Sequence, residues 1–153
     1  MRSLVDKPVW DAELRPRLTP IFAVVAAVII ALAHIVVGFL LKIGSSGVIF
    51  QTADQVAIGI LGVVIGCVVL LFTRPRLRIG PQGLAVRNLL GEKLISWSDV
   101  EGVSFHTGAR WARVDLPDYE YHPVMAIQAV DKARAVEAMD TVRALMDKYQ
   151  VGR

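Results

Sequence analysis

The sequence of 153 residues is poor in the side chains that enzymes and metal sites use most. It has one cysteine, Cys67, which excludes an internal disulfide. No cysteine accompanies His106 and His122, so we expect no zinc site. The sequence lacks a nucleophile elbow, a phosphate-binding loop and a dinucleotide fingerprint. It also lacks a basic stripe with interleaved aromatics. We therefore predict a protein that is not an enzyme, with no cofactor and no nucleic-acid partner, and the sequence identifies no small-molecule substrate.

Charge is absent from two long stretches in the first half of the chain. Residues 21–41 carry no ionised side chain, and a helix of that length spans about 31 Å, against about 30 Å of bilayer hydrocarbon. Residues 56–72 carry no ionised side chain either, and they reach spanning length if the helix begins at Ala53, a start that Thr52 and Gln55 support as a capping box. Only helices and closed barrels satisfy their backbone hydrogen bonds in lipid. We predict a transmembrane helical hairpin over residues 21–73.

Basic residues indicate how this hairpin is oriented. Four Lys and Arg residues lie in the segment 1–20, and Arg74, Arg76 and Arg78 follow the second helix. The link at residues 43–52 has none, so the positive-inside rule places both termini in the cytoplasm. The first apolar run is too long for a secretory signal, and no cleavage site follows it. We predict a multi-pass protein of the plasma (inner) membrane with a polar N-terminal segment.

Small residues recur at helical spacing in both apolar stretches. Such spacing lets helix backbones approach closely, which drives association in lipid. The two predicted helices can pack on each other in this way, or they can offer a docking face to the helices of a partner. The predicted helix-packing residues are Ala23, Ala27, Ala31, His34, Gly38, Gly59, Gly62 and Gly66.

His34 is the one strongly polar residue of the first stretch. An ionisable group inside a membrane suggests a proton relay or a metal ligand. No Asp, Glu, Cys or second His lies within residues 21–41 to complete such a site. We therefore interpret His34 as a neutral side chain that is hydrogen-bonded across a helix contact.

The last 80 residues read as a water-soluble α+β domain. Short alternating segments separated by turn residues over residues 76–130 predict six or seven antiparallel strands in a small barrel or sandwich, with Pro123 at a strand start or edge. Asp131 is expected to cap a helix over residues 131–149 that covers the sheet. Its apolar stripe comprises Val136, Met139, Val142, Leu145 or Met146, and Tyr149.

Several segments of this region resemble the actinobacterial PH-like domain family known as low-molecular-weight protein antigen 6. They are Gly-Leu-Ala-Val-Arg-Asn at 83–88, Ile-Ser-Trp-Ser-Asp-Val at 95–100 and Pro-Val-Met-Ala-Ile-Gln at 123–128. The resemblance implies two membrane helices before a seven-stranded barrel that is closed by a C-terminal helix, without known catalytic activity. It also implies that Trp97, Phe105 and Trp111 pack in the core or at the rim of the barrel.

Lipid recognition does not follow from this resemblance. Lipid-binding PH domains use Lys and Arg around the first hairpin, where this sequence has Pro81, Gln82 and Gly83. The membrane-proximal Arg74, Arg76 and Arg78 can each contribute about 1 kcal/mol near anionic headgroups, but the flank of a membrane helix already accounts for them.

Two classes of function fit the sequence. The first is a non-catalytic accessory or scaffold subunit of a larger membrane complex, for which a respiratory oxidase assembly is one host. The second is a freestanding membrane-tethered module that binds a peptide or an anionic lipid. In either class, we predict a polar rim for a protein partner, formed by Arg110, Arg113, Asp118, Tyr119, Glu120 and Tyr121.

Overall fold

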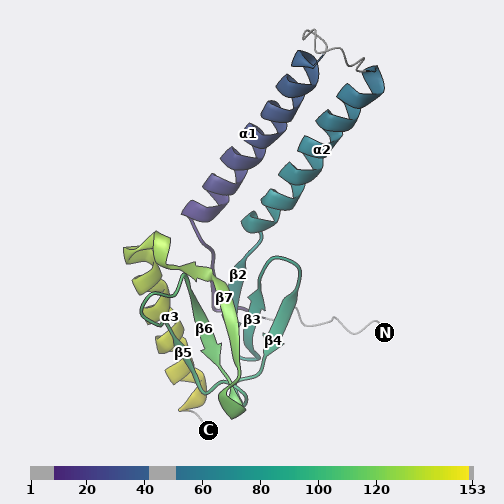
Figure 1. The fold of residues 1–153 in the computed structure, drawn as a ribbon. Coiled ribbons are helices and arrows are strands. Elements are labelled where there is room, and N and C mark those ends of the chain that lie inside the picture. The colour runs from purple at the N-terminus through teal and green to yellow at the C-terminus, as the bar shows by residue number, and fades with distance from the viewer. Residues whose placement is uncertain (1–8, 42–50, 152–153) are drawn as a thin grey trace, which may run out of the picture. The chain divides into compact units, whose positions relative to one another are not determined.

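The computed structural model describes residues 9–41 and 51–151, which form two compact units (Figure 1). One unit, Thr19–Thr73, holds two long helices, and we call it the hairpin. The other unit combines the residues up to Leu18 with those from Arg74 onward, and we call it the domain. The domain is thus built from two stretches of sequence that flank the hairpin.

The hairpin contains helices α1 (Leu18–Leu40) and α2 (Thr52–Leu70), followed by the 3-10 turn Leu71–Thr73. Both are long and apolar enough to cross a membrane, and only 17% and 11% of their most apolar windows are buried. The N-cap of α2 is Gln51, whose backbone N–H donates to the Asp54 carboxylate at 2.8 Å. The predicted capping box at Thr52 was therefore one residue too late. The predicted link around residues 44–47 lies outside the described residues.

The domain has two antiparallel sheets. Helix α3 (Ala133–Gln150) packs against them, and 3-10 turns occupy Pro117–Tyr119 and Ala129–Asp131 (Figure 1). The first sheet has the order β1 (Ala12–Leu14), β2 (Arg76–Gly80), β3 (Gly83–Arg87) and β4 (Glu92–Ile95), and the second has the order β5 (Gly102–Ser104), β6 (Trp111–Asp115) and β7 (Tyr121–Gln128).

The predicted closed barrel is not present among the described strands, because no hydrogen-bonded pairing joins β4 to β5. The two sheets meet instead where β7 packs against β2 and β3. Asn88 links them at this corner: its Nδ2 donates to the carbonyl of Pro123 at 2.9 Å, and its Oδ1 accepts the N–H of Met125 at 3.1 Å. Pro123 lies in β7, an edge strand, which suits a residue without a backbone donor.

Strand β1 was not predicted, because residues 1–20 read as a polar leader. It pairs with β2 in the register Ala12 to Ile79 and Leu14 to Leu77. Beyond the strand, the Asp131 carboxylate accepts the backbone N–H groups of Arg17 and Leu18, each at 3.0 Å. Asp131 thus binds the segment that leads into α1 and does not cap α3 as predicted.

The core of the domain lies between the sheets and α3. Burial alternates along β2, which places Leu77 and Ile79 on the inner face, whereas β3 buries four successive residues from Gly83 to Val86. Helix α3 buries Ala135, Met139 and Val142, whereas Val136, assigned to the buried stripe from sequence, is 62% exposed. The N-cap of α3 is Lys132, so the helix begins later than predicted. Met139 and Val142 are buried as predicted, and Ala135 takes the place of Val136 in the core.

Candidate functional site

Polar and aromatic side chains gather on the outer face of the three-stranded sheet. Alternation along β6 buries Ala112 and Val114 and turns Trp111, Arg113 and Asp115 outward. These residues and their neighbours border a hollow of about 300 Å³, which we call the aromatic hollow. Its lining residues are His106, Ala109, Arg110, Trp111, Arg113, Tyr121 and Pro123.

Arg113 is held in place by four neighbours, one of which is Ser104, whose Oγ accepts a hydrogen bond from Nε at 3.3 Å. Its Nε lies 2.8 Å from Oδ1 of Asp115, and its Nη2 donates to Nε2 of His106 at 2.9 Å. Its guanidinium carbon lies 4.9 Å from the centre of the Tyr121 ring, within the range of a cation–π contact. The guanidinium is therefore oriented before any partner arrives, which lowers the entropy cost of binding.

The nearby Ser104 and His106 do not form a nucleophile and base. Nε2 of His106 accepts a hydrogen bond from Arg113, so the proton of the neutral ring sits on Nδ1, 3.4 Å from Oγ of Ser104. The serine oxygen faces a donor rather than an acceptor, so it has no base to activate it. The hollow instead offers partly exposed aromatic rings, Trp111 at 38% and Tyr121 at 58%, beside a fixed cation. Tyr, Trp and Arg are the residues that dominate protein–protein binding energy.

The structure divides the predicted rim into two groups. Arg110, Arg113 and Tyr121 line the hollow, whereas Asp118, Tyr119 and Glu120 lie in the exposed turn between β6 and β7. The prediction missed His106 and Pro123, which the strand register brings to the hollow. That register includes an irregularity between residues 111 and 112, which no local sequence pattern predicts.

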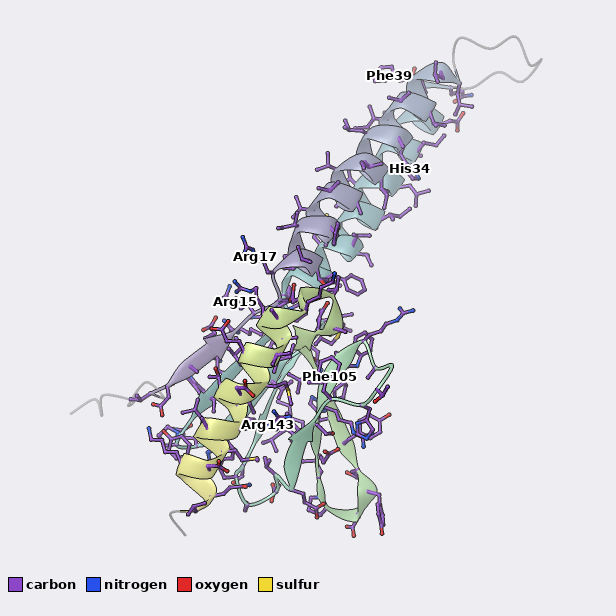
Figure 2. All side chains as sticks on the ribbon, turned by 90° about the vertical axis from the view of Figure 1, so that its left-hand side faces the viewer. Arg15, Arg17, His34, Phe39, Phe105 and Arg143 are labelled. Atoms are coloured by element: carbon purple, nitrogen blue, oxygen red, sulfur yellow. The ribbon has the colours of Figure 1, made fainter. Side chains whose placement is uncertain are left out.

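The predicted barrel-packing residues occupy different depths. Trp97 is buried, donates from Nε1 to the carbonyl of Gly80 at 2.9 Å and stacks on Tyr149 with ring centres 5.6 Å apart. Phe105 is partly buried against the core and lies between α3 and the three-stranded sheet (Figure 2). Trp111 lies at the rim, in the aromatic hollow.

Within the hairpin, small residues mark the closest approaches of the two helices. A Cβ added to Gly66 would lie 3.3 Å from the carbonyl oxygen of Ala27, and one added to Gly38 would lie 3.2 Å from that of Gln55. Ala23 and Ala27 are buried and Ala31 is half-buried. Gly59 is different, because an added Cβ there would meet nothing within 4 Å.

His34 lies over Gly62, where an added Cβ would come within 2.4 Å of the histidine Cβ. Its Nδ1 donates to the carbonyl of Ile30 in the same helix at 2.8 Å. The predicted hydrogen bond across the helix contact is therefore replaced by one within α1. Among the described residues, no group of three or more His, Cys, Asp or Glu side chains is placed to hold a metal ion.

Two of the three membrane-proximal arginines belong to the four-stranded sheet. Arg76 and Arg78 both form ion pairs with Glu92 of β4, at 3.1 Å for Arg76, and Arg78 also lies 4.8 Å from the centre of the Trp10 ring. Burial alone would raise the pKa of Glu92, but hydrogen bonds and charge from the two arginines bring it below its ordinary value. Arg74 is exposed.

Comparison with known proteins places this chain among PH-like proteins. A family model described as Bacterial PH domain matches residues 74–145. The chain is 65% identical over 141 residues to the uncharacterized protein Rv1417 of Mycobacterium tuberculosis and equally to the uncharacterized protein Mb1452 of Mycobacterium bovis, with 92% of each chain covered.

A shorter match of 43% identity over 37 residues relates it to low molecular weight protein antigen 6 of Mycobacterium tuberculosis. That match covers 24% of this chain and 32% of the antigen. No solved structure matches the chain significantly. PH domains are generally non-catalytic and mediate protein or lipid interactions. The resemblance predicted from the sequence is confirmed: the chain belongs to the bacterial PH domain family.

Proposed function

We propose that this protein is a non-catalytic scaffold subunit of a larger membrane complex. Helices α1 and α2 hold it in the bilayer, and the PH-like domain binds a neighbouring subunit on the cytoplasmic side. The exposed apolar surface of the two helices supports the membrane anchor, since large apolar side chains such as Phe22, Ile29 and Phe39 are more than half exposed. Exposure of such an apolar surface to water is unfavourable in free energy, whereas lipid or the helices of a partner would cover it.

The observation that carries the proposal is the pairing of β1 with β2. These strands lie on opposite sides of the hairpin in sequence, yet they are hydrogen-bonded neighbours in one sheet. A cleaved signal sequence would take β1 away, and a single membrane span would separate the two strands across the bilayer. Two spans keep both strands on the same side. The basic residues that flank the hairpin favour the cytoplasmic side.

The aromatic hollow is the proposed binding surface for the neighbouring subunit. Its exposed rings and fixed guanidinium have the composition of an interface centre. The proposal predicts that Trp111→Ala and Tyr121→Ala weaken the complex. Tyr119→Ala is the matched control, because Tyr119 is fully exposed in the adjacent turn and lies outside the hollow.

The test is gentle detergent extraction of the tagged full-length protein, followed by native electrophoresis and mass spectrometry of what migrates with it. The expected result is a stoichiometric complex that is lost with Trp111→Ala or Tyr121→Ala and kept with Tyr119→Ala. Subunits of a respiratory oxidase are the first partners to look for. A monomer or homodimer would contradict the scaffold role and favour the freestanding module.

A further inference from the structure

Strand β4 is the last strand of its sheet, and among the described residues it pairs with β3 alone (Figure 1). The N–H of Asn88 donates to the carbonyl of Gly91 at 3.2 Å, so these two residues are a hydrogen-bonded pair of the hairpin. In an antiparallel ladder such pairs alternate with pairs whose backbone groups point away from each other. The register therefore turns the N–H and C=O groups of Glu92 and Leu94 away from β3, to the open edge of the sheet.

Open space accompanies this edge. A hollow of about 410 Å³ lies between the turn at residues 88–91 and β7, and a second one of about 290 Å³ lies between β4 and the turn at residues 116–120. Lys93 lines both hollows. The four residues of β4 span about 13 Å, and Asn88 closes the opening at one end through its hydrogen bonds to β7. The space thus runs along the unpaired edge, where an extended segment could lie.

Lys93 lies on the inner face of its sheet. It is directly opposite Val86, which is 1% exposed in the core. His122 is likewise opposite the fully buried Val114 in the other sheet. Because residues directly opposite each other share a face, Lys93 and His122 both lie on inner faces, at the open side of the domain. A charged side chain therefore occupies an inward position of an edge strand.

Lys93 has no acidic partner at this position. Within the described part of the chain no carboxylate forms an ion pair with it, although Asp99, Asp118 and Glu120 line one of its two hollows. Burial, and after it the charge of Lys93, hold the pKa of His122 below its ordinary value. An inward lysine discourages the pairing of an edge strand with other chains, because an apolar residue opposite it leaves the charge unpaired. A strand with a carboxylate opposite Lys93 avoids that cost.

A second copy of β4 does not supply this carboxylate. The inward side chains of β4 are Lys93 and Ile95, and Glu92 lies on the outer face, where Arg76 and Arg78 form ion pairs with it. A second copy would therefore bring another lysine to the inner face. The side chain that suits the position beside the buried Ile95 is apolar. The edge thus fits a foreign segment that alternates an acidic and an apolar residue on its inward side.

We propose that the open edge of β4 binds an extended segment of a partner protein as a fifth strand of this sheet, with a carboxylate opposite Lys93 and an apolar residue opposite Ile95. Backbone hydrogen bonds to Glu92 and Leu94 supply affinity, and Lys93 selects the sequence. This surface is separate from the aromatic hollow, which lies on the outer face of the other sheet. The inference does not rest on the proposed function, because it uses contacts of the domain alone.

A synthetic peptide tests this strand addition on the full-length protein in mild detergent. The probe is fluorescein-labelled Lys-Gly-Thr-Val-Thr-Glu-Thr-Val-Thr-Gly-Lys, in which the valines and the central glutamate share one face of a strand. Its alternation is symmetric about the glutamate, so this residue can face Lys93 in either strand direction. The comparison peptide has lysine in place of the glutamate. Fluorescence anisotropy measures the dissociation constant of each peptide.

We expect saturable binding of the glutamate peptide and binding of the lysine peptide that is at least about tenfold weaker, because like charges then face each other. Lys93→Glu should reverse this preference. Leu94→Pro should abolish binding, since it removes an outward N–H that takes no part in the ladder with β3. Leu94→Ala is the matched control and should keep binding. Tryptophan fluorescence during denaturation verifies that each variant is folded.

Three outcomes would overturn the inference. The first is equal binding of the two peptides or none at all, and the second is a preference that Lys93→Glu leaves unchanged. The third is a dimer in light scattering that Leu94→Pro converts to a monomer, which would assign the edge to a second copy. The charge reversal at Lys93 decides the question even if Leu94→Pro fails to fold. None of these outcomes affects the proposed function, which the extraction experiment tests at the aromatic hollow.

Discussion

The hairpin and the domain place their large apolar side chains on opposite sides. In the hairpin the buried positions of the two helices are small, Ala23, Ala27, Gly38, Gly62 and Gly66, while valine, leucine and phenylalanine side chains face outward. In the domain Leu77, Ile79 and Leu84 are fully buried. The same residue types are inside one unit and outside the other because the proposed surroundings differ, lipid for the hairpin and water for the domain.

The two regions also differ in how they use the sequence. The hairpin is one continuous stretch, and its described contacts join α1 to α2. The domain is discontinuous, since β1 precedes the hairpin and β2 follows it. Lys148 donates to the Asp11 carboxylate at 2.8 Å, and Tyr149 also donates to it, so the N-terminal segment is bound to the end of α3 as well. Substitutions that affect one region and spare the other test this difference.

The largest effect is expected from Leu14→Asp in β1. Leu14 packs against the core of the domain, so an aspartate would lose apolar burial and bring a charge toward an apolar surface. We expect the free energy of unfolding of the domain to fall by about 3 kcal/mol. Tryptophan fluorescence during denaturation measures it selectively, because Trp10, Trp97 and Trp111 all lie outside the hairpin.

The matched control for this change is Val9→Asp, since Val9 is 71% exposed. It should leave the denaturation midpoint nearly unchanged. If Leu14→Asp behaves like Val9→Asp, the segment before the hairpin is only a leader, and the domain is continuous in sequence after all.

A smaller effect is expected from Gly62→Ala in the hairpin. The added methyl group would collide with the His34 side chain and force the helices apart at that level. Overpacking of this kind costs about 1–2 kcal/mol. Thermal unfolding followed by far-ultraviolet circular dichroism in mild detergent should show an earlier loss of helix, with the tryptophan signal of the domain unchanged. Gly59→Ala is the control, because its methyl group meets open space. Equal melting of the two variants would mean that His34 does not pack against α2.

The smallest effect concerns His122 and pH. Burial and the charge of Lys93 hold the pKa of His122 below its ordinary value of 6.5. The unfolded chain therefore binds a proton first as the pH falls below 6.5, and the stability of the domain decreases from there downward. Glu92, whose pKa is lowered from 4.5, keeps its full contribution above that pH and loses it only below.

The change in denaturation midpoint between pH 6.5 and pH 4.5 is thus assigned to His122. His122→Gln should reduce this change in midpoint, and the reduction should be only a fraction of the effect of Leu14→Asp. Tryptophan fluorescence at several pH values measures this in the unsubstituted protein and in His122→Gln side by side. A slope that persists in His122→Gln would show that another group titrates there.

Local patterns in the sequence predict the two long helices and most of the strands after residue 75 well. The apolar runs place both helices within three residues of their structural ends, because length and absence of charge alone determine them. Alternation likewise marks β2 and β6, where Leu77 and Val114 point inward between polar neighbours. The features that these local patterns leave unspecified depend on residues that are distant in sequence. Strand β1 has three residues and needs β2 to pair with, and the aromatic hollow needs the register of β6 on β7.

The helix at the end of the chain shows why polar residues are harder to assign than apolar ones. Asp131 has the position of a helix cap in the local sequence, yet its carboxylate binds N–H groups more than 100 residues away in sequence. His34 shows the same difficulty, since the carbonyl of Ile30 in its own helix accepts its hydrogen bond. A polar side chain has several acceptable partners, and only the assembled fold selects among them.

The position of β1 before the hairpin has a consequence for biosynthesis. During translation, β1 leaves the ribosome first and remains without its partner strand until the whole hairpin has been made and β2 has followed. If the hairpin enters the bilayer as proposed, the sheet is completed only after both helices are threaded in the correct orientation. A chain in which one helix fails to insert would have β1 and β2 in separate compartments. The edge of β2 would then be exposed to chaperones and proteases. Folding of the domain would then act as a proofreading step for membrane insertion.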